Sequence, residues 1–358
     1  MSVFYITLII TFILAFLARI MKQKNNKISN VFVFFIIILL VIVAGNQTNI
    51  GDTPQYMTIY RKLVVNPASV DLNYDGGFTF FMIILTKISK DSQILIIISA
   101  IIINLINIKM FLKYESLLEI QLFLYIASGY YIVTMNGIRQ CMVAAVFLYS
   151  TKYIEQGKFL KYCIITFILS MFHQSAFIMI PVYFILRCKP WSKLTFAIIG
   201  GSIVTVLSIN KFLPLLFEVL KGTNYSHYET YISAGNGGAN VMRIAIAAVP
   251  VVLAYIKRDI LAEKWKSSGI FVNAALLNIV FFIFSTVNWI FARFNIYFQM
   301  YTFILLAYLI KECFPKKEKR LLYFSCIVFY FIVFWYEYDK LMNLQYVWNS
   351  NWFNIFGN

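Results

Sequence analysis

The sequence predicts an all-α, polytopic integral membrane protein, and two features carry this prediction: its composition and its recurrent apolar runs. Of its 358 residues, 61% are hydrophobic and 13% are charged, whereas soluble domains are about 45–50% apolar and about 25% charged. This composition excludes a water-soluble enzyme, and the small number of Gly and Pro residues excludes disordered and collagen-like chains. Because a membrane helix needs about 20 apolar residues, we expect about 10–12 transmembrane helices in a single domain, residues 1–358.

Apolar runs that predict membrane helices follow one another along the whole chain. They cover residues 3–20, 31–45, 77–90, 94–112, 120–135, 138–154, 162–186, 194–210, 241–256, 269–286, 294–310 and 321–336. Run 77–90 is short and run 162–186 is long, so we expect re-entrant or broken helices there. Such elements occur where protein or a water-filled cavity covers the backbone, and they often mark functional sites.

Basic residues concentrate in the short links between apolar runs. The links 19–27, 257–266 and 311–320 are clearly basic, and the positive-inside rule places them in the cytoplasm. Counting from them makes residues 46–76 and 211–240 outer loops. The net charge of +16 therefore reflects membrane topology, and we expect no nucleic-acid partner.

Five lysines distinguish two topologies: Lys109, Lys113, Lys152, Lys158 and Lys161. If every run crosses once, these lysines lie outside. If run 77–90 does not cross and run 162–186 is a hairpin that returns to its own side, they lie inside. We favour this second topology because it strengthens the cytoplasmic bias of the basic residues. It also places Arg139 on the outer side.

The most informative polar stretch is Asn136-Gly137-Ile138-Arg139-Gln140, at the start of an apolar run. Its spacing predicts that Asn136, Arg139 and Gln140 share one helix face. An arginine there costs several kcal/mol unless it meets water or an anion, and its planar guanidinium suits the oxygens of a phosphate. The stretch indicates an anion site, and a snorkelling arginine at a helix end is the structural alternative.

A second polar stretch, Phe172-His173-Gln174-Ser175-Ala176, interrupts run 162–186. An imidazole at membrane depth can act as a general base, a proton relay or a hydrogen-bond donor to a ligand. A buried histidine bonded to a backbone carbonyl is the structural alternative. The presence of a histidine and of Arg139 in nearby apolar segments favours a functional role for both.

The first outer loop carries Asp52, Tyr56 and Tyr60 at i, i+4 and i+8. On a helix this spacing gives one face with a carboxylate and two aromatic rings, which suits sugars. Asp52 stands before a Pro and a Gln, however, so it equally predicts an N-cap with a capping box. Both interpretations stay open. Arg293, which opens a later helix on the outer side, is another candidate cation with the same snorkelling alternative.

Motifs for other chemistries are absent from the sequence. It contains no Walker A, GxGxxG or HExxH motif and no aspartate pair of the kind that holds Mg²⁺. The five cysteines have no CxxC spacing, which indicates neither a disulfide framework nor a zinc site. We therefore expect no metal and no other cofactor.

Together the two polar stretches resemble the EpsG family of bacterial Wzy-like polysaccharide polymerases, over residues 45–310. The pairing of Asn136-Gly137-Ile138-Arg139-Gln140 with a later Phe-His-x-Ser-Ala carries most of the resemblance. It implies a GT-C-like fold of the Wzy type and a metal-independent glycosyltransferase in the bacterial cytoplasmic membrane.

Weaker elements extend the resemblance. Asp52 with Tyr56 and Tyr60 is similar to the family's Asp-x₃-Tyr element, and Arg293 is similar to its late arginine. Asp75 precedes Gly-Gly-Phe where the family usually has an acidic residue before Gly-Phe. Because a Glu with a different neighbour is expected there, we assign Asp75 no role.

The resemblance implies a reaction at the outer face of the membrane. A glycan on undecaprenyl diphosphate is transferred to the next lipid-linked repeat unit, building capsule, exopolysaccharide or O-antigen. The implied partners are undecaprenyl-diphosphate-linked oligosaccharides, the lipid bilayer, a chain-length regulator and a flippase. A lipid-linked oligosaccharide flippase or transporter and an O-antigen ligase-type transferase are the competing interpretations.

The resemblance also implies roles for the site residues. Arg139 and Arg293 would bind the diphosphate, with Asn136 and Gln140 as further substrate contacts. Asp52, Tyr56 and Tyr60 would contact sugars, and His173 would act as general base or orient the acceptor. Both His173 and Asp52 are candidates for the base.

Overall fold

The computed structural model describes residues 1–67, 75–114, 116–208, 218, 238 and 240–349, and all regular elements in this part of the chain are helical. The predicted all-α, multi-pass membrane class is confirmed. Five described helices are long and apolar enough to cross a membrane alone, or up to seven if each of two bent helix pairs is one span. Several other predicted runs form shorter apolar helices of 10–17 residues. Most of the predicted outer loop 211–240 lies outside the described residues.

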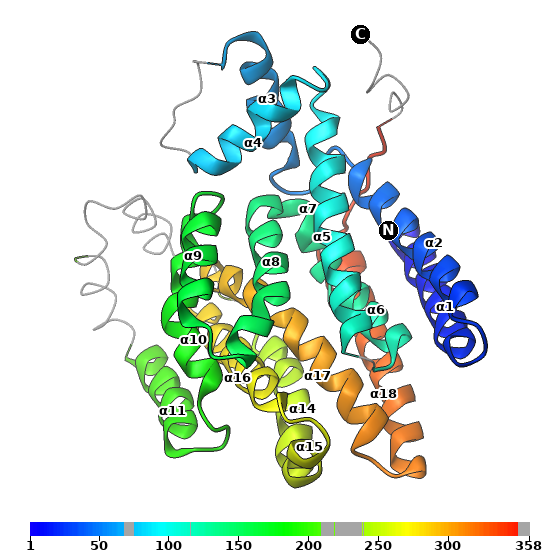
Figure 1. Ribbon diagram of the computed structural model, residues 1–358, viewed down its shortest axis with the longest axis vertical. Coiled ribbons are helices and arrows are strands. Elements are labelled where there is room, and N and C mark those ends of the chain that lie inside the picture. The colour runs from blue at the N-terminus through cyan, green and yellow to red at the C-terminus, as the bar shows by residue number, and fades with distance from the viewer. Residues whose placement is uncertain (68–74, 115, 209–217, 219–237, 239, 350–358) are drawn as a thin grey trace. The chain divides into compact units, whose positions relative to one another are not determined.

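The helices form two compact units, residues 1–183 with 314–358 and residues 184–313. The first contains α1 (Ser2–Lys24), α2 (Asn26–Gly45), α3 (Thr53–Val65), α4 (Gly76–Thr86), α5 (Gln93–Lys113), α6 (Leu118–Ala127), α7 (Tyr130–Asn136), α8 (Ile138–Glu155), α9 (Phe159–Ser170), η2 (Gln174–Ile178), the start of α10 (Met179–Arg187), α18 (Lys316–Phe334) and η4 (Trp335–Leu341) (Figure 1). The predicted organisation as a single domain stays a prediction.

The second unit is built around α16 (Ser268–Ser285), which contacts the other helices of this unit. These are α11 (Lys193–Leu207), α14 (Met242–Ile256), α15 (Arg258–Lys264), η3 (Trp289–Tyr297) and α17 (Gln299–Glu312). The buried Asn273 of α16 donates to the carbonyl of Cys188 at 2.7 Å and to that of Ile185 at 3.1 Å. This side chain therefore satisfies carbonyls at the end of α10, which have no partner within their own helix.

Helix α1 packs one side against the protein and exposes apolar residues on its other side. Helix α1 buries Phe4, Leu8 and Ala15 and exposes Ile6 and Ile13. An apolar residue on every face is typical of a membrane span, where the side away from the protein meets lipid tails. At the tight turn to α2, the Asn25 side chain accepts hydrogen bonds from the first backbone N–H groups of α2.

Contacts within the first unit bring most of its basic residues together at one end, which we call the basic end. There the last turns of α1, α5 and α8 meet the starts of α6 and α18 through the pairs Arg19–Glu119, Tyr323–Glu119 and Lys113–Glu155. The chain places these residues at the basic end: Arg19, Lys22, Lys24, Lys27, Lys109, Lys113, Lys152, Lys158, Lys161, Lys316, Lys317, Lys319 and Arg320.

The opposite end of this unit, the site end, comprises loop 46–52, α3, α4 and the start of α8. Helices α3 and α4 pack against each other there (Figure 1). The buried Gln93, at the start of α5, donates to the carbonyl of Gly45 at 2.6 Å and accepts from the Asn349 side chain at 2.9 Å. One side chain thus joins the end of α2, the start of α5 and residues 343–349, which we call the C-terminal segment.

Run 162–186 is a broken hairpin, as the second topology predicts. Helix α9 rises to the site end and α10 returns, because the rings of Phe159 and Tyr183 lie 5.0 Å apart and those of Tyr162 and Tyr183 lie 5.2 Å apart. Helix α4 has 11 residues, so it is about 16 Å long and too short for a hydrocarbon core of about 30 Å. The five lysines that distinguish the topologies therefore share one end with Arg19.

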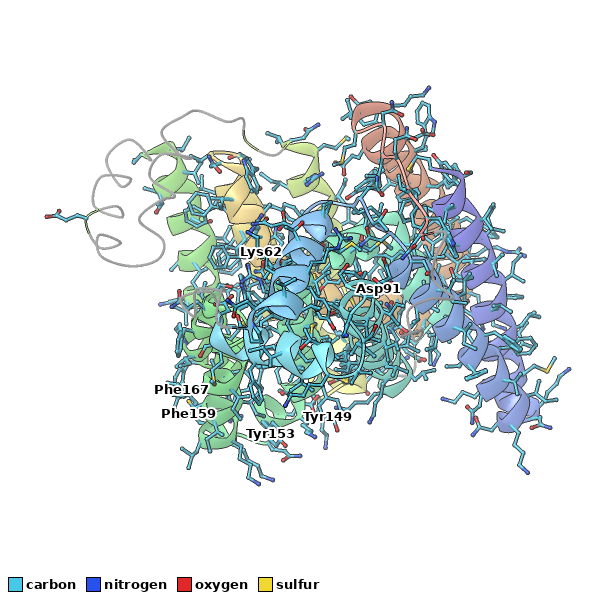
Figure 2. All side chains as sticks on the ribbon, turned by 90° about the horizontal axis from the view of Figure 1, so that it is seen from above. Lys62, Asp91, Tyr149, Tyr153, Phe159 and Phe167 are labelled. Atoms are coloured by element: carbon cyan, nitrogen blue, oxygen red, sulfur yellow. The ribbon has the colours of Figure 1, made fainter. Side chains whose placement is uncertain are left out.

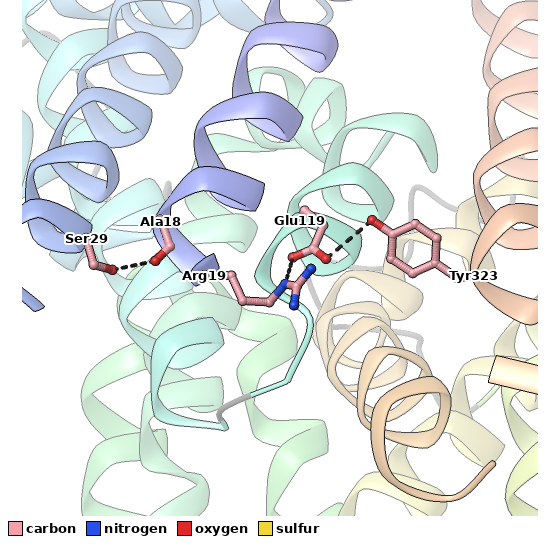
Figure 3. A network of polar contacts seen from close by, with 5 residues as sticks. All are labelled: Ala18, Arg19, Ser29, Glu119 and Tyr323. Atoms are coloured by element: carbon pink, nitrogen blue, oxygen red, sulfur yellow. Dashed lines mark hydrogen bonds and ion pairs between the residues drawn. The ribbon is translucent and has the colours of Figure 1, made fainter. Parts of the chain in front are cut away.

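The ion pair at the basic end leads to a stability prediction. The Glu119 carboxylate is fully buried, accepts from Arg19 Nε at 2.9 Å and accepts from the Tyr323 hydroxyl at 3.3 Å (Figure 3). Arg19→Ala should lower the free energy of unfolding by about 1–3 kcal/mol, because it leaves a buried charge with one partner fewer. Thermal unfolding in detergent measures this, with the exposed Lys24→Ala as control. Equal melting temperatures for the two variants would contradict it.

Candidate functional site

A carboxylate, a guanidinium and an imidazole meet at the site end of the first unit. Arg139 Nη1 lies 2.6 Å from Asp75 Oδ2, and His173 Nδ1 lies 3.6 Å from the same oxygen. The side chains of Arg139, Asp75 and His173 are 16%, 14% and 21% exposed. The three groups are therefore mostly, but not fully, shielded from solvent. Two of the three, Arg139 and His173, come from the polar stretches that the sequence singles out.

Arg139 is placed by a helix break. Helix α7 ends at Asn136, Gly137 has non-helical torsion angles (φ −89°, ψ 54°), and α8 begins at Ile138. Arg139 therefore lies in the first turn of α8, where the helix dipole also favours an anion. The prediction that Asn136, Arg139 and Gln140 share one helix face is wrong, because the break at Gly137 separates Asn136 from the helix that carries the other two.

The side chains of Asn136 and Gln140 make contacts within the protein. Asn136 Oδ1 accepts the backbone N–H of Asp52 at 2.9 Å, so its side chain fixes the loop before α3. The Thr53 hydroxyl adds a bond to the Met135 carbonyl at 3.0 Å. Gln140 is buried, with 4% exposed. These contacts dock the first loop onto the end of α7, next to Arg139.

Asp75 is held in a strained backbone conformation directly before α4. Its φ angle is +24°, which L-residues rarely adopt and which costs on the order of 1–3 kcal/mol. The Gly77 backbone N–H donates to the Met171 carbonyl at 2.8 Å. A Cβ on Gly77 would lie 2.8 Å from the Met171 Cβ, so only glycine allows α4 to approach the tip of the hairpin this closely. The approach brings Asp75 next to His173.

Aromatic rings surround the guanidinium. The Arg139 Cζ atom lies 5.6 Å from the centre of the Tyr56 ring and 5.9 Å from that of the Phe78 ring. Arg139 Nε donates to the Tyr56 hydroxyl at 3.4 Å. Further rings continue from Phe78 through Phe81 to Phe172, which precedes His173. These contacts hold Arg139 and the hairpin tip in place and make one wall of the site apolar.

The other residues predicted to contact sugars lie in different surroundings. Tyr56 and Tyr60 are 3% and 0% exposed, and the Tyr60 hydroxyl donates to the Ser89 carbonyl at 2.8 Å. Asp52 is the N-cap residue of α3 by position, but its side chain makes no capping hydrogen bond. We therefore describe Tyr56 as a neighbour of Arg139 and Tyr60 as a core residue.

Arg293 belongs to the second unit. It lies in η3, and its guanidinium lies 5.4 Å from the centre of the Trp289 ring. The Asn288 side chain accepts from the Ile290 backbone N–H at 3.0 Å and caps the start of this element. Arg293 is thus a cation packed on an aromatic ring, and a role in diphosphate binding stays a prediction.

Asp75 is the site residue that sequence reasoning missed. Its sequence signal is an acidic residue followed by two glycines and a phenylalanine. The glycines permit a close approach of two backbones and so indicate that the acidic residue lies near another segment. Among the described residues, no group of three or more His, Cys, Asp and Glu side chains is arranged to hold a metal ion. The groups that meet at the described site are one carboxylate, one guanidinium and one imidazole.

A comparison with protein families shows to which family the chain belongs. Residues 30–349 match the model of the EpsG family. The chain belongs to the EpsG family. The resemblance expected over residues 45–310 is thereby confirmed over nearly the whole chain. EpsG membership indicates a polymerase-like, glycosyltransferase-like function in polysaccharide biosynthesis. No curated protein and no solved structure matches the chain.

The loop that carries Asp52 gives a prediction for this EpsG-family protein. Gly51 has φ +53°, and a Cβ there would lie 2.0 Å from Asn136 Oδ1. Gly51→Ala should therefore displace the loop from α7, costing about 1–3 kcal/mol of stability and reducing polysaccharide yield. The measurements are thermal unfolding and total glycan. Gly200→Ala is the control, since a Cβ there meets no atom within 4 Å. Equal stability of both variants would show that Asn136 does not fix this loop.

Proposed function

We propose that this EpsG-family protein polymerises undecaprenyl-diphosphate-linked repeat units at the outer face of the bacterial cytoplasmic membrane. The observation that supports this most strongly is the meeting of Arg139, Asp75 and His173 at one site. Glycosyl transfer from a lipid diphosphate requires a cation that stabilises the leaving diphosphate and a base that takes the proton of the attacking hydroxyl.

The distribution of charge supports an outer location of the site. Within the first unit, 13 Lys and Arg residues lie at the basic end, and six lie at the site end: Arg61, Lys62, Lys87, Lys90, Arg139 and Lys340. The positive-inside rule assigns the basic end to the cytoplasm. The Arg139 site then faces outward, where the repeat units are assembled into polymer in the proposed reaction.

In the proposed reaction the acceptor hydroxyl attacks the anomeric carbon of the growing glycan. The new bond joins the acceptor oxygen to this carbon, and the bond from the carbon to the diphosphate oxygen breaks. Undecaprenyl diphosphate leaves, and the hydroxyl proton passes to a base. Arg139 would stabilise the negative charge that develops on the leaving diphosphate, since a guanidinium retains further N–H donors after binding one carboxylate.

Of the two predicted bases, His173 has the better-defined surroundings. Its Nδ1 lies 3.6 Å from Asp75 Oδ2, so the negative carboxylate attracts the imidazolium that forms and favours its position in the site. We assign His173 as the base and Asp75 as the residue that positions both His173 and Arg139. Arg293 as a second diphosphate ligand, and a flippase and a chain-length regulator as partners, belong to the same proposal.

Glycan analysis of a deletion strain tests the proposed function. Loss of a polymerase should leave single repeat units on the cell surface, and the ladder of longer glycans should return on expression of the wild-type protein. Loss of all surface glycan, with lipid-linked units held inside the cell, would instead identify a flippase. Unchanged ladder lengths with free polymer unattached to its normal carrier would identify a ligase-type transferase.

The role of His173 gives a separate prediction. His173→Gln keeps a hydrogen-bonding side chain but cannot take up a proton, so polymer formation should fall by about 10²–10⁴-fold. The ladder is measured in cells with equal membrane abundance of the two proteins. Gln174→Ala, an exposed neighbour, should keep the normal ladder. A normal ladder in His173→Gln would show that His173 is not the base.

A further inference from the structure

Besides the Arg139 site, the site end of the first unit contains a polar pocket with a volume of about 400 Å³. Its lining residues come from loop 46–52, from α3, from the segment before α5 and from the C-terminal segment. They are Thr48, Pro54, Met57, Thr58, Arg61, Asp91 and Asn349. Figure 2 looks onto this end and labels Asp91, which lines the pocket, and Lys62 of α3, which does not.

Helix α3 separates this pocket from the Arg139 site. Pro54, Met57, Thr58 and Arg61 are spaced i, i+3, i+4 and i+7 and form one face of the helix. Tyr56, which contacts Arg139, is two positions from Thr58 and therefore lies on the opposite side. An α-helix with its side chains is about 10 Å thick, so the thickness of α3 is comparable to the length of a short oligosaccharide.

Hydrogen bonds between distant parts of the chain build the wall that contains Asn349. Its backbone N–H donates to the Asn46 carbonyl at 2.8 Å, and its side chain donates to Gln93 Oε1 at 2.9 Å. The Thr48 backbone N–H donates to the Val347 carbonyl at 3.2 Å. The C-terminal segment is thus fixed against loop 46–52, and the pocket is a defined part of the fold.

The chemistry of the lining suits a sugar ring. Two hydroxyls, an amide, a carboxylate and a guanidinium can bind ring hydroxyls, while Pro54 and Met57 offer an apolar surface to the C–H face. Arg61 has no ion-pair partner among the described residues, so its donors are available to a hydroxyl or to the carboxylate of a sugar acid. The volume lies within the range of about 300–1,000 Å³ that is usual for ligand pockets.

We propose that this pocket is a second glycan subsite, which holds a sugar of the repeat-unit chain whose reacting end lies at Arg139. The identity of the ligand as a repeat-unit glycan rests on the proposed function. A subsite beside the reacting centre fixes the position of the glycan chain. Its loss should therefore weaken binding of the glycan and shorten the polymer.

Binding of a free glycan tests the subsite without requiring catalysis. The probe is the single-repeat oligosaccharide released by mild acid from the lipid-linked unit of the producing bacterium. It is titrated into the full-length protein in detergent micelles, and binding is followed by saturation-transfer NMR. Wild type and Arg139→Ala should bind it alike. Thr58→Trp, which fills the pocket from an exposed position, should bind at least about tenfold more weakly.

Lys62→Trp is the matched control, because Lys62 is exposed on the same helix but does not line the pocket. It should bind like the wild type. If Thr58→Trp fails to fold, as judged by thermal unfolding, Arg61→Ala provides the same comparison from another exposed position. Unchanged binding in a folded pocket variant would overturn the proposal.

Glycan ladders from the same variants separate this inference from the proposed function. Thr58→Trp should shift the ladder to shorter chains, whereas Lys62→Trp should not. An unchanged ladder in Arg139→Ala would contradict the proposed function, yet the binding result would still decide whether the pocket takes glycan. A normal ladder and normal binding in Thr58→Trp would overturn the subsite even if Arg139→Ala abolishes polymerisation.

Discussion

Arg139→Ala should collapse the glycan ladder to single repeat units while the protein inserts normally into the membrane. The change removes the cation that we assign to the leaving diphosphate, and loss of such a contact lowers a rate by about 10²–10³-fold. Arg139→Lys should recover little activity, because an ammonium cannot reproduce the guanidinium's simultaneous contacts with Asp75 and Tyr56. The measurement is glycan length on a gel, with membrane abundance determined in parallel.

Lys90→Ala is the control for this experiment. Lys90 is an exposed cation at the same end of the first unit, so its removal reports the effect of lowering the local charge alone. It should leave the ladder unchanged. A full ladder in Arg139→Ala would remove the guanidinium from the mechanism and make Arg139 a structural residue at the start of α8.

Asp75→Asn should have an effect of similar size. Asparagine matches aspartate in shape and tolerates positive φ, so the backbone before α4 should keep its conformation. The substitution removes the charge that pairs with Arg139 and faces His173. The imidazolium would lose its stabilising partner, and we expect about 10²-fold or greater loss of polymer formation.

Asp75→Gly separates the charge of Asp75 from its strained backbone. Glycine adopts φ +24° without a steric penalty, so this variant should unfold at a temperature no lower than that of Asp75→Asn. Its activity should nevertheless stay lost, because the carboxylate is absent. Recovery of the ladder in Asp75→Gly would show that backbone conformation, and not the carboxylate, is what the site requires.

The sequence predicts those features of the molecule that follow from the free-energy cost of placing a charged or polar residue in an apolar segment. An arginine or a histidine inside an apolar run is energetically unfavourable and is therefore a candidate for a functional role. Both Arg139 and His173 lie in the site. Lysines at the ends of apolar runs predict which ends share a side of the membrane, and the hairpin of run 162–186 follows from their distribution. These signals can be interpreted without knowledge of tertiary contacts.

Features that depend on packing between distant segments could not be predicted. Asp75 meets Arg139 across 64 positions of sequence, and the contact depends on the close approach of Gly77 to Met171. The spacing of Tyr56 and Tyr60 predicts a shared helix face, but spacing does not say whether that face is exposed or buried. The prediction that Asn136 and Arg139 share a helix face assumed one continuous helix. The break at Gly137 could not be predicted from the spacing of these residues.

Reconstitution tests the central claim most directly. The purified full-length protein is placed in liposomes with undecaprenyl-diphosphate-linked repeat units from the producing bacterium, and glycan length and released undecaprenyl diphosphate are measured for wild type and Asp75→Asn. We predict that the wild type lengthens the glycan and releases one undecaprenyl diphosphate per bond formed, while Asp75→Asn does neither. Movement of the lipid-linked units across the bilayer without any glycan lengthening would contradict the account.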